Sequence, residues 1–186
     1  MSHPVRGSCR GGRAARDPAR SESLENAQAM ADTPAFQDLY PDRWSHCYGC
    51  GRLNDHGLHV RSFWEGDQTV ARVVPRPEHT SLPGYVYGGL IASAIDCHST
   101  GSAAAAAQRA AGGAFEVGAL PRFVTARLEV DFLAPAPVAA PLELRSTIDE
   151  VRERKVTVST ELSAAGKLCA RGRAVLVRVP DSWLPG

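Results

Sequence analysis

The sequence predicts an α+β domain in which an antiparallel sheet wraps around one long central helix. One run, residues 89–111, is rich in Ala, Leu and Ile, lacks proline and ends at the glycine pair 112–113. Segments of alternating apolar and polar residues stand on both sides of it. Strands and helices do not alternate as they do in parallel βαβ sheets. The expected order is therefore two strands, the helix and four strands.

The two strands before the helix come from residues 57–75. Apolar and polar residues alternate on both sides of Glu65-Gly66-Asp67, which is a turn signal. This pattern predicts a β-hairpin. A loop rich in proline follows it and leads to the helix.

Four strands are expected after the helix. Residues 141–179 supply three of them, separated by a charged turn at 152–154 and a second turn at 165–167. The first of the four, RFVTARLEVDFLAP, alternates clearly, so its apolar side chains should share one face. These side chains are Val124, Ala126, Leu128, Val130 and Phe132.

Residues 1–35 differ from the rest, and we expect a disordered leader before a folded domain over residues 36–186. Five arginines recur in the leader among Gly, Ser, Ala and Pro, without a sustained apolar period. An organelle transit peptide would share the arginines, but Asp17, Glu22 and Glu25 argue against one. Translation from Met30 is a second alternative.

Composition and charge limit the kinds of binding partner that we expect. The net charge of +1 gives no bias toward nucleic acid or acidic membranes. No apolar run reaches the roughly 18–20 residues that a membrane span needs. Five cysteines without a secretory signal argue against a disulfide framework. We therefore expect a cytoplasmic protein that binds neither nucleic acid nor membranes.

The stretch GYVYGGLIASAID, residues 84–96, places a glycine pair at the start of the helix and one carboxylate inside it. A helix N-terminus offers unpaired amides, and glycine lets another group approach them closely. Gly88 and Gly89 are thus candidates to polarise a carbonyl, and Asp96 is a candidate nucleophile or general base. The alternatives are glycines that only permit a tight turn and an aspartate that only faces solvent.

The eight-residue spacing from Gly88 to Asp96 places the amides and the carboxylate far apart along the helix. Eight residues of α-helix rise about 12 Å, whereas reacting groups must approach to about 3–3.5 Å. If Gly88 and Asp96 act on one carbonyl, they must come from different subunits. Two antiparallel helices across a twofold axis would bring them together.

Four stretches carry a family resemblance that runs from Cys47 to Val179. The chain resembles the hot-dog-fold acyl-CoA thioesterases of the phenylacetate-degradation type. The resemblance implies hydrolysis of an acyl-CoA thioester at the interface of a homodimer or dimer of dimers, with no metal or redox cofactor. One position departs from the family pattern, because Tyr87 stands where His is common. The four stretches are CYGCGRLNDHGLHV, HTSLPGYVYGGLIASAID, TARLEVDFLAPAPV and RKVTVSTELSAAGKLCARGRAVLV.

Other residues near the helix are candidates for substrate contacts. Thr100 follows Asp96 by one helical turn and would hold the carboxylate or a water, unless its hydroxyl bonds back to its own helix. His79 and Ser81, in the loop before the helix, join Tyr87 as residues expected to line the acyl site.

The turn that contains Arg152, Arg154 and Lys155 is a candidate for binding the phosphates of coenzyme A. The alternative is a solvated charged turn.

The motif Cys47-Tyr48-Gly49-Cys50 raises the question of a zinc site. Structural zinc sites usually pair such a motif with a second, well-spaced pair of ligands. The nearby His56 and His59 follow too closely for a zinc finger, and the strand-to-helix context of a thioredoxin motif is absent. We therefore expect a packing role and no metal.

Two rival functions stay open. A hot-dog hydratase or dehydratase would need a histidine beside the acid, and His98, two residues from Asp96, should point elsewhere. A non-catalytic acyl-CoA sensor of the same fold is the other rival, and Tyr87 is the residue that favours it.

Overall fold

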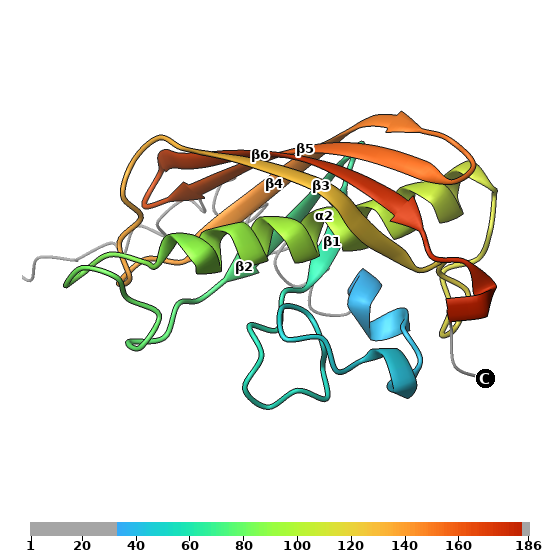
Figure 1. Ribbon diagram of the computed structural model, residues 1–186, viewed down its shortest axis with the longest axis horizontal. Coiled ribbons are helices and arrows are strands. Elements are labelled where there is room, and N and C mark those ends of the chain that lie inside the picture. Colours follow the sequence, from blue (N-terminus) through green and yellow to red (C-terminus); the bar gives the residue numbers. More distant parts are fainter. Residues whose placement is uncertain (1–32, 184–186) are drawn as a thin grey trace, which may run out of the picture. The chain divides into compact units, whose positions relative to one another are not determined.

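The computed structural model describes residues 33–183, of which residues from Pro34 onward form one compact unit. Residues 1–32, which hold nearly all of the predicted leader, lie outside the described residues. Three short 3-10 helices, six strands and one long helix follow one another (Figure 1). In chain order they are η1 (Phe36–Leu39), η2 (Asp42–Trp44), β1 (Ser62–Glu65), β2 (Gln68–Val73), α2 (Gly88–Ala110), β3 (Phe123–Phe132), β4 (Leu142–Val151), β5 (Lys155–Ala164), β6 (Lys167–Arg178) and η3 (Asp181–Trp183).

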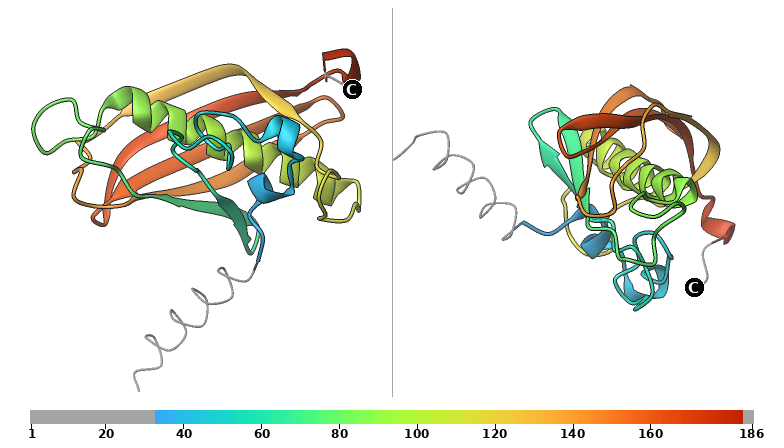
Figure 2. Two further views of the ribbon diagram at one scale, coloured as in Figure 1. Left: turned by 90° about the horizontal axis from the view of Figure 1, so that it is seen from below. Right: turned by 90° about the vertical axis from the view of Figure 1, so that its left-hand side faces the viewer.

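The six strands form one antiparallel sheet in the order β1-β2-β4-β5-β6-β3. The sheet curves around α2, which contacts all six strands and packs most closely against β3, β4, β5 and β6 (Figure 2). The predicted α+β class, the hairpin at Gly66 and the long central helix are confirmed. This is the hot-dog arrangement that the resemblance implies.

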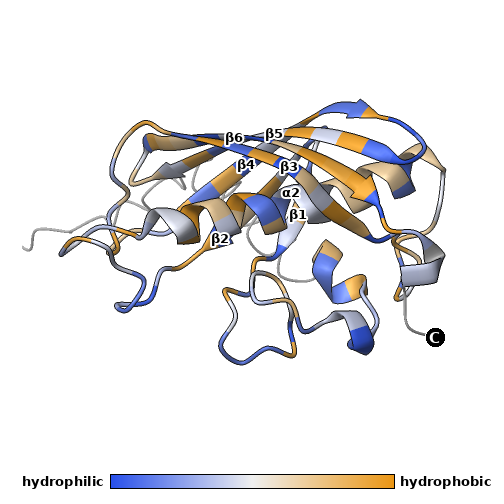
Figure 3. Cartoon of the chain, in the orientation of Figure 1, coloured by the Kyte–Doolittle hydropathy of each residue, from blue (hydrophilic) through white to orange (hydrophobic). Residues whose placement is uncertain are grey.

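The core fills the space between α2 and the sheet in two clusters. One surrounds the N-terminal half of the helix, with Leu90, Ile91 and Ile95, and the other surrounds its alanine-rich second half. Ala103, Ala104 and Ala105 are completely buried, and their small side chains let the helix lie close to η1 and the sheet. Hydrophobic and hydrophilic residues alternate along the strands (Figure 3), as expected for a sheet with one covered face.

The predicted apolar face of β3 is wrong in its first half. The pairing of β3 with β6 shifts between Thr125 and Arg127, so Ala126 is an extra residue that forms a β-bulge. Before the bulge Phe123 is buried and Thr125 half-buried, whereas Val124 and Ala126 are exposed. The bulge therefore turns a threonine toward α2 where the alternation predicts a valine and an alanine.

Candidate active site

Asp96 lies in the middle of α2, half-buried beneath the first half of β3. Its Oδ1 atom accepts a short hydrogen bond from the hydroxyl of Thr125. The alternation of β3 predicts that this threonine lies on the opposite face, so nothing in the sequence indicates the contact. The bulge at Ala126 accounts for the contact.

Thr100 does not hold the carboxylate. Its hydroxyl donates to the backbone oxygen of Asp96 over 2.9 Å, which is the alternative that the sequence left open. It also lies 3.4 Å from the hydroxyl of Thr125. Thr100 thus supports the residue that binds the acid.

Asp96 opens into a cavity of about 330 Å³. The cavity combines one carboxylate, two threonine hydroxyls, one guanidinium and three thiols within a small space. Arg122 brings a positive charge into the cavity, although no sequence motif marks this residue. The lining residues are Asp96, Thr100, Thr125, Arg122, Phe123, Val124, Cys47, Cys50 and Cys97.

The N-terminus of α2 lies two turns away from this cavity. Tyr87 is the N-cap residue and makes no side-chain cap, and the first amides that bond to its carbonyl oxygen are those of Leu90 and Ile91. Among the described residues, no hydrogen bond from the amide of Gly88 or Gly89 is found. These two donors are therefore free to bind a carbonyl oxygen.

The two glycines line separate cavities on either side of the helix end. Gly88 lies with Ser81 and Phe132 in a mainly apolar cavity of about 520 Å³. Gly89 lies with His79 and Tyr87 in a second cavity of about 300 Å³. Neither of these cavities contains Asp96. Within one chain, the predicted carbonyl-binding amides and the predicted acid thus belong to different cavities.

The ring of Tyr87 folds over Gly89. A Cβ atom at residue 89 would lie 2.3 Å from the ring, so any larger residue would displace the tyrosine. The side chain remains 59% exposed, and its hydroxyl makes no hydrogen bond among the described residues. Tyr87 therefore borders the helix N-terminus as an apolar ring with a free hydroxyl.

His79 holds the loop that precedes α2. Its backbone oxygen accepts a hydrogen bond from the amide of Tyr87 over 2.9 Å. Its ring nitrogens lie 3.0 and 3.2 Å from the backbone and side-chain nitrogens of Arg76. Burial lowers the pKa of His79, and the charge of Arg76 lowers it further. A neutral, anchored imidazole suits a structural part in this cavity better than proton transfer.

The turn predicted to bind phosphates partly neutralises itself. Arg152 and Lys155 both pair with Glu150, at 2.5 and 3.3 Å. The hydrogen bonds from these two side chains lower the pKa of the Glu150 carboxyl. The turn lies at the end of the sheet where β3 begins, because Lys155 and Val124 both pair with Val177. It is thus at the same end of the sheet as Thr125.

Three thiols meet beside Asp96. Cys97, the next residue of α2, joins Cys47 and Cys50 in a group whose sulfur atoms all lie within 4.8 Å of one another. Hydrogen bonds from the Cys50 and Cys97 thiols lower the pKa of Cys47, and the hydrogen bond to Cys47 raises the pKa of Cys50 to about 12. The sequence motif marks the first two cysteines but not the third, because only the fold brings Cys97 near them.

His98 faces away from the Asp96 cavity. It is completely buried, and its Nδ1 atom lies 2.8 Å from the hydroxyl of Ser62. Burial lowers the pKa of His98 from 6.5 to about 4, so the ring is neutral at ordinary pH. The expectation that it points away from the acid is confirmed.

Membrane insertion by a helix finds no support in the described part of the chain. Within residues 33–183, no helix has the length and apolar character that a membrane crossing requires.

Known proteins resemble this chain in sequence and in structure. A family model of the thioesterase superfamily matches residues 83–170. A thioesterase superfamily protein of Shewanella loihica PV-4 is 50% identical, with a TM-score of 0.57, and the match covers 75% of this chain and 98% of that one. No curated protein matches significantly.

Two further structures are linked by name to phenylacetic acid degradation. A putative thioesterase of Ralstonia eutropha JMP134 is 25% identical, with a TM-score of 0.51 over 66% of this chain and 86% of that one. The PaaI protein of Escherichia coli has a TM-score of 0.55 over 86% of this chain and 95% of that one, and at 14% identity it supports the fold alone. From these matches and the fold, the chain belongs to the thioesterase superfamily and has the hot-dog fold.

Proposed function

We propose that this thioester hydrolase cleaves an acyl-CoA thioester at an interface between two copies of the chain. Asp96 comes from one copy and the Gly88-Gly89 amides come from the other. One observation carries the proposal: in a single chain the free amides and the carboxylate line different cavities. Either group alone lacks half of what thioester hydrolysis requires.

The outer edge of β3 supports a second copy as the missing half. Within residues 33–183, β3 is an edge strand of ten residues, and its one neighbour in the sheet is β6. Val124 and Phe132 on this strand are 40% and 58% exposed. A long, unpaired edge is a liability that pairing with another strand removes.

The same strand links the two half-sites. Its start contacts Asp96 through Thr125, and its end lies with Gly88 in one cavity through Phe132. An antiparallel pairing of two copies of β3 about a twofold axis brings the Thr125 end of one strand toward the Phe132 end of the other. That arrangement would complete two equivalent sites.

The chemistry follows from the groups in place. The free amides of Gly88 and Gly89 would stabilise the negative charge that develops on the thioester oxygen. Asp96 would attack the carbonyl carbon directly or take a proton from an attacking water. The Thr125 hydroxyl, bound to Oδ1, orients the carboxylate and leaves the other oxygen free to react. Water cleaves the C–S bond overall, giving a carboxylic acid and a free thiol.

Coenzyme A remains our choice of thiol carrier. The 152–155 turn is positively charged and lies at the same end of the sheet as Thr125. Of its three basic residues, Arg154 makes no ion pair among the described residues, so it is the side chain that we assign to a phosphate. Within one chain, no described histidine stands beside Asp96, because His98 is buried on another face. This supports hydrolysis over hydration.

The substrate class is tested by measuring thiol release from a panel of aromatic, medium-chain and long-chain acyl-CoA esters. We expect hydrolysis of at least one ester and no hydration of crotonyl-CoA. Acyl-CoA binding without thiol release from any ester would refute the proposal and favour a sensor.

The interface is tested by mixing two inactive variants, Asp96→Asn and Gly88→Leu. Gly88 belongs to the helix, and a Cβ atom there would contact the Phe132 ring at 3.4 Å without overlap. The backbone therefore accepts a side chain, and leucine would crowd the space in front of the amides. A mixed dimer contains one site with both defects and one intact site. Co-expression should recover about a quarter of wild-type activity, since about half of the dimers are mixed. No recovery in a sample shown to contain mixed dimers would place each site within one chain.

A further inference from the structure

We propose that Cys47, Cys50 and Cys97 bind a zinc ion, with water from the Asp96 cavity as the fourth ligand. The sulfur atoms of Cys47 and Cys97 lie 3.8 Å apart. Zinc–sulfur bonds of about 2.3 Å in a tetrahedron place two sulfurs about 3.8 Å apart. The third sulfur lies within 4.8 Å of both. The spacing thus fits one shared ion, whereas a disulfide requires about 2.05 Å.

The loop that carries the first two cysteines is held in place by its own contacts. The amide of Gly51 donates to the backbone oxygen of Cys47 over 2.7 Å, and the amide of Leu53 donates to that of Ser45 over 2.9 Å. These bonds close a tight turn around Cys47 and Cys50. The two sulfurs therefore need little rearrangement to bind an ion.

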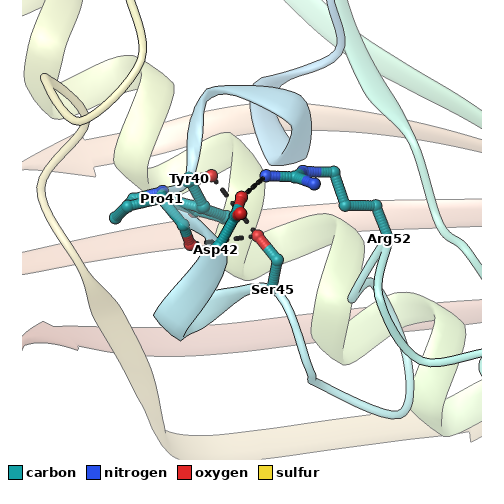
Figure 4. Close-up of polar contacts among 5 residues, drawn as sticks. All are labelled: Tyr40, Pro41, Asp42, Ser45 and Arg52. Carbon is teal, nitrogen blue, oxygen red and sulfur yellow. Dashed lines mark hydrogen bonds and ion pairs between the residues drawn. The ribbon is translucent and has the colours of Figure 1, made fainter.

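Contacts at the base of this loop anchor it to η2 (Figure 4). The buried hydroxyl of Ser45 donates to the backbone oxygens of Tyr40 and Pro41, at 3.3 and 3.1 Å. Arg52 forms a short ion pair with Asp42. Both ends of the 45–52 segment are thus fixed to the preceding turn.

The third ligand comes from α2, which is why the spacing in the sequence gave no sign of it. Gly49 lies directly over Cys97, and a Cβ atom at residue 49 would be 2.1 Å from its sulfur. Glycine is therefore required for the loop to reach the helix. The nearby histidines are not needed: His59 bonds to the backbone oxygen of Asn54 over 2.7 Å.

Charge also fits the ion. Zinc with three thiolates has a net charge of −1, and the protons of the thiols pass to solvent on binding. Arg122 lines the same cavity and acts electrostatically on Cys50. Within the described residues its Nη1 atom is buried without a hydrogen bond, and no carboxylate pairs with it. A zinc–thiolate group beside Arg122 would balance this charge.

A zinc ion here would clamp the 45–52 loop to α2 at the residue next to Asp96. Binding does not depend on thioester hydrolysis, so the two can be tested separately. The ion would hold one wall of the Asp96 cavity in place and would leave its coordinated water facing that cavity.

The test is the zinc content of the full chain, purified without chelator from zinc-supplemented medium. We expect about one zinc per chain. Cys97→Ser should reduce the content at least tenfold, whereas Cys169→Ser should leave it unchanged. Cys169 is the matched control because it is also buried and belongs to β6, outside the group. Equal zinc content in wild type and Cys97→Ser would show adventitious binding and overturn the proposal.

A second measurement needs no variant. Cobalt added to the metal-free wild type should produce an intense thiolate-to-cobalt charge-transfer band, and equimolar zinc should slow the alkylation of Cys47, the half-exposed thiol of the group. Equal alkylation rates with and without zinc, or a native Cys47–Cys97 disulfide found by mass spectrometry, would overturn the proposal.

Discussion

Asp96 and His98 lie two residues apart on α2, yet they face different surroundings. About 200° of helix rotation separates their directions. Asp96 is half-buried and faces a cavity with a threonine hydroxyl at one of its oxygens. His98 is sealed between the helix and the sheet, where Ser62 bonds its ring. Access to a cavity, rather than the type of titratable group, therefore makes Asp96 a catalytic candidate and leaves His98 a structural residue.

Asp96→Asn gives the largest expected effect and tests the first half of this comparison. The isosteric amide fits the same place but cannot attack or accept a proton, so kcat should fall by roughly 10²–10⁴. The measurement is thiol release from the preferred acyl-CoA ester, with unfolding followed in parallel. Asp67→Asn, in the exposed β1–β2 turn, is the control and should keep full activity. Full activity of Asp96→Asn would end the catalytic assignment.

Thr125→Val comes next and separates the two threonines. It removes the hydroxyl that binds the carboxylate, and a hydrogen bond to a charged group is worth enough to lower kcat roughly tenfold. Thr125→Ser should restore most of the rate. Thr100→Val should change kcat less than about threefold, because that hydroxyl bonds to the backbone. A larger loss in Thr100→Val than in Thr125→Val would show that Thr100, as the sequence predicted, holds the carboxylate or a water.

His98 governs stability rather than rate. Its pKa is about 4 in the folded chain and 6.5 when unfolded, so between these values the unfolded chain binds the proton more readily. Stability is then complete above pH 6.5 and falls as the pH drops toward 4. From pH 7 to pH 5 this residue should remove about 2 kcal/mol from the free energy of unfolding.

Denaturant unfolding of wild type and His98→Asn at the two pH values measures this difference. The variant loses the packing of the buried imidazole ring, so its stability at pH 7 should be lower, but its pH-dependent loss should be smaller by that amount. His46→Asn, at an exposed position, should keep the wild-type dependence. An unchanged pH dependence in His98→Asn would show that other groups cause it.

Tyr87→Phe gives the smallest expected effect. Because the hydroxyl makes no hydrogen bond among the described residues, its loss should change kcat/KM less than about twofold. Tyr87→Ala removes the ring that covers Gly89 and should alter the preference among acyl groups. A large loss in the phenylalanine variant would indicate that the hydroxyl contacts the substrate.

The elements of the fold were predictable because each leaves a local sign in the sequence. The helix shows as a proline-free apolar run and the hairpin as two alternating segments around Glu65-Gly66-Asp67. Thr125, Cys97 and Arg122 could not be predicted as neighbours of Asp96 and the loop thiols. Their positions depend on a bulge and on contacts between segments far apart in the chain, and neither leaves a periodic pattern.

The bulge in β3 shows that the number of residues in a strand, as well as their type, decides which side chains face the helix. Without the extra residue Ala126, alternation counted back from Leu128 would still keep Thr125 on the helix side, in one unbroken phase. With the extra residue but no bulge, the same count would turn Thr125 outward and leave Asp96 without a hydroxyl. Substituting Ala126 should therefore have little effect on the hydrogen bond of Asp96. One more residue inserted beside Ala126, with the bulge unchanged, would turn Thr125 to the outer face of the sheet. The hydrogen bond between Thr125 and Asp96 thus depends on the number of residues in β3 rather than on the side chain at position 126.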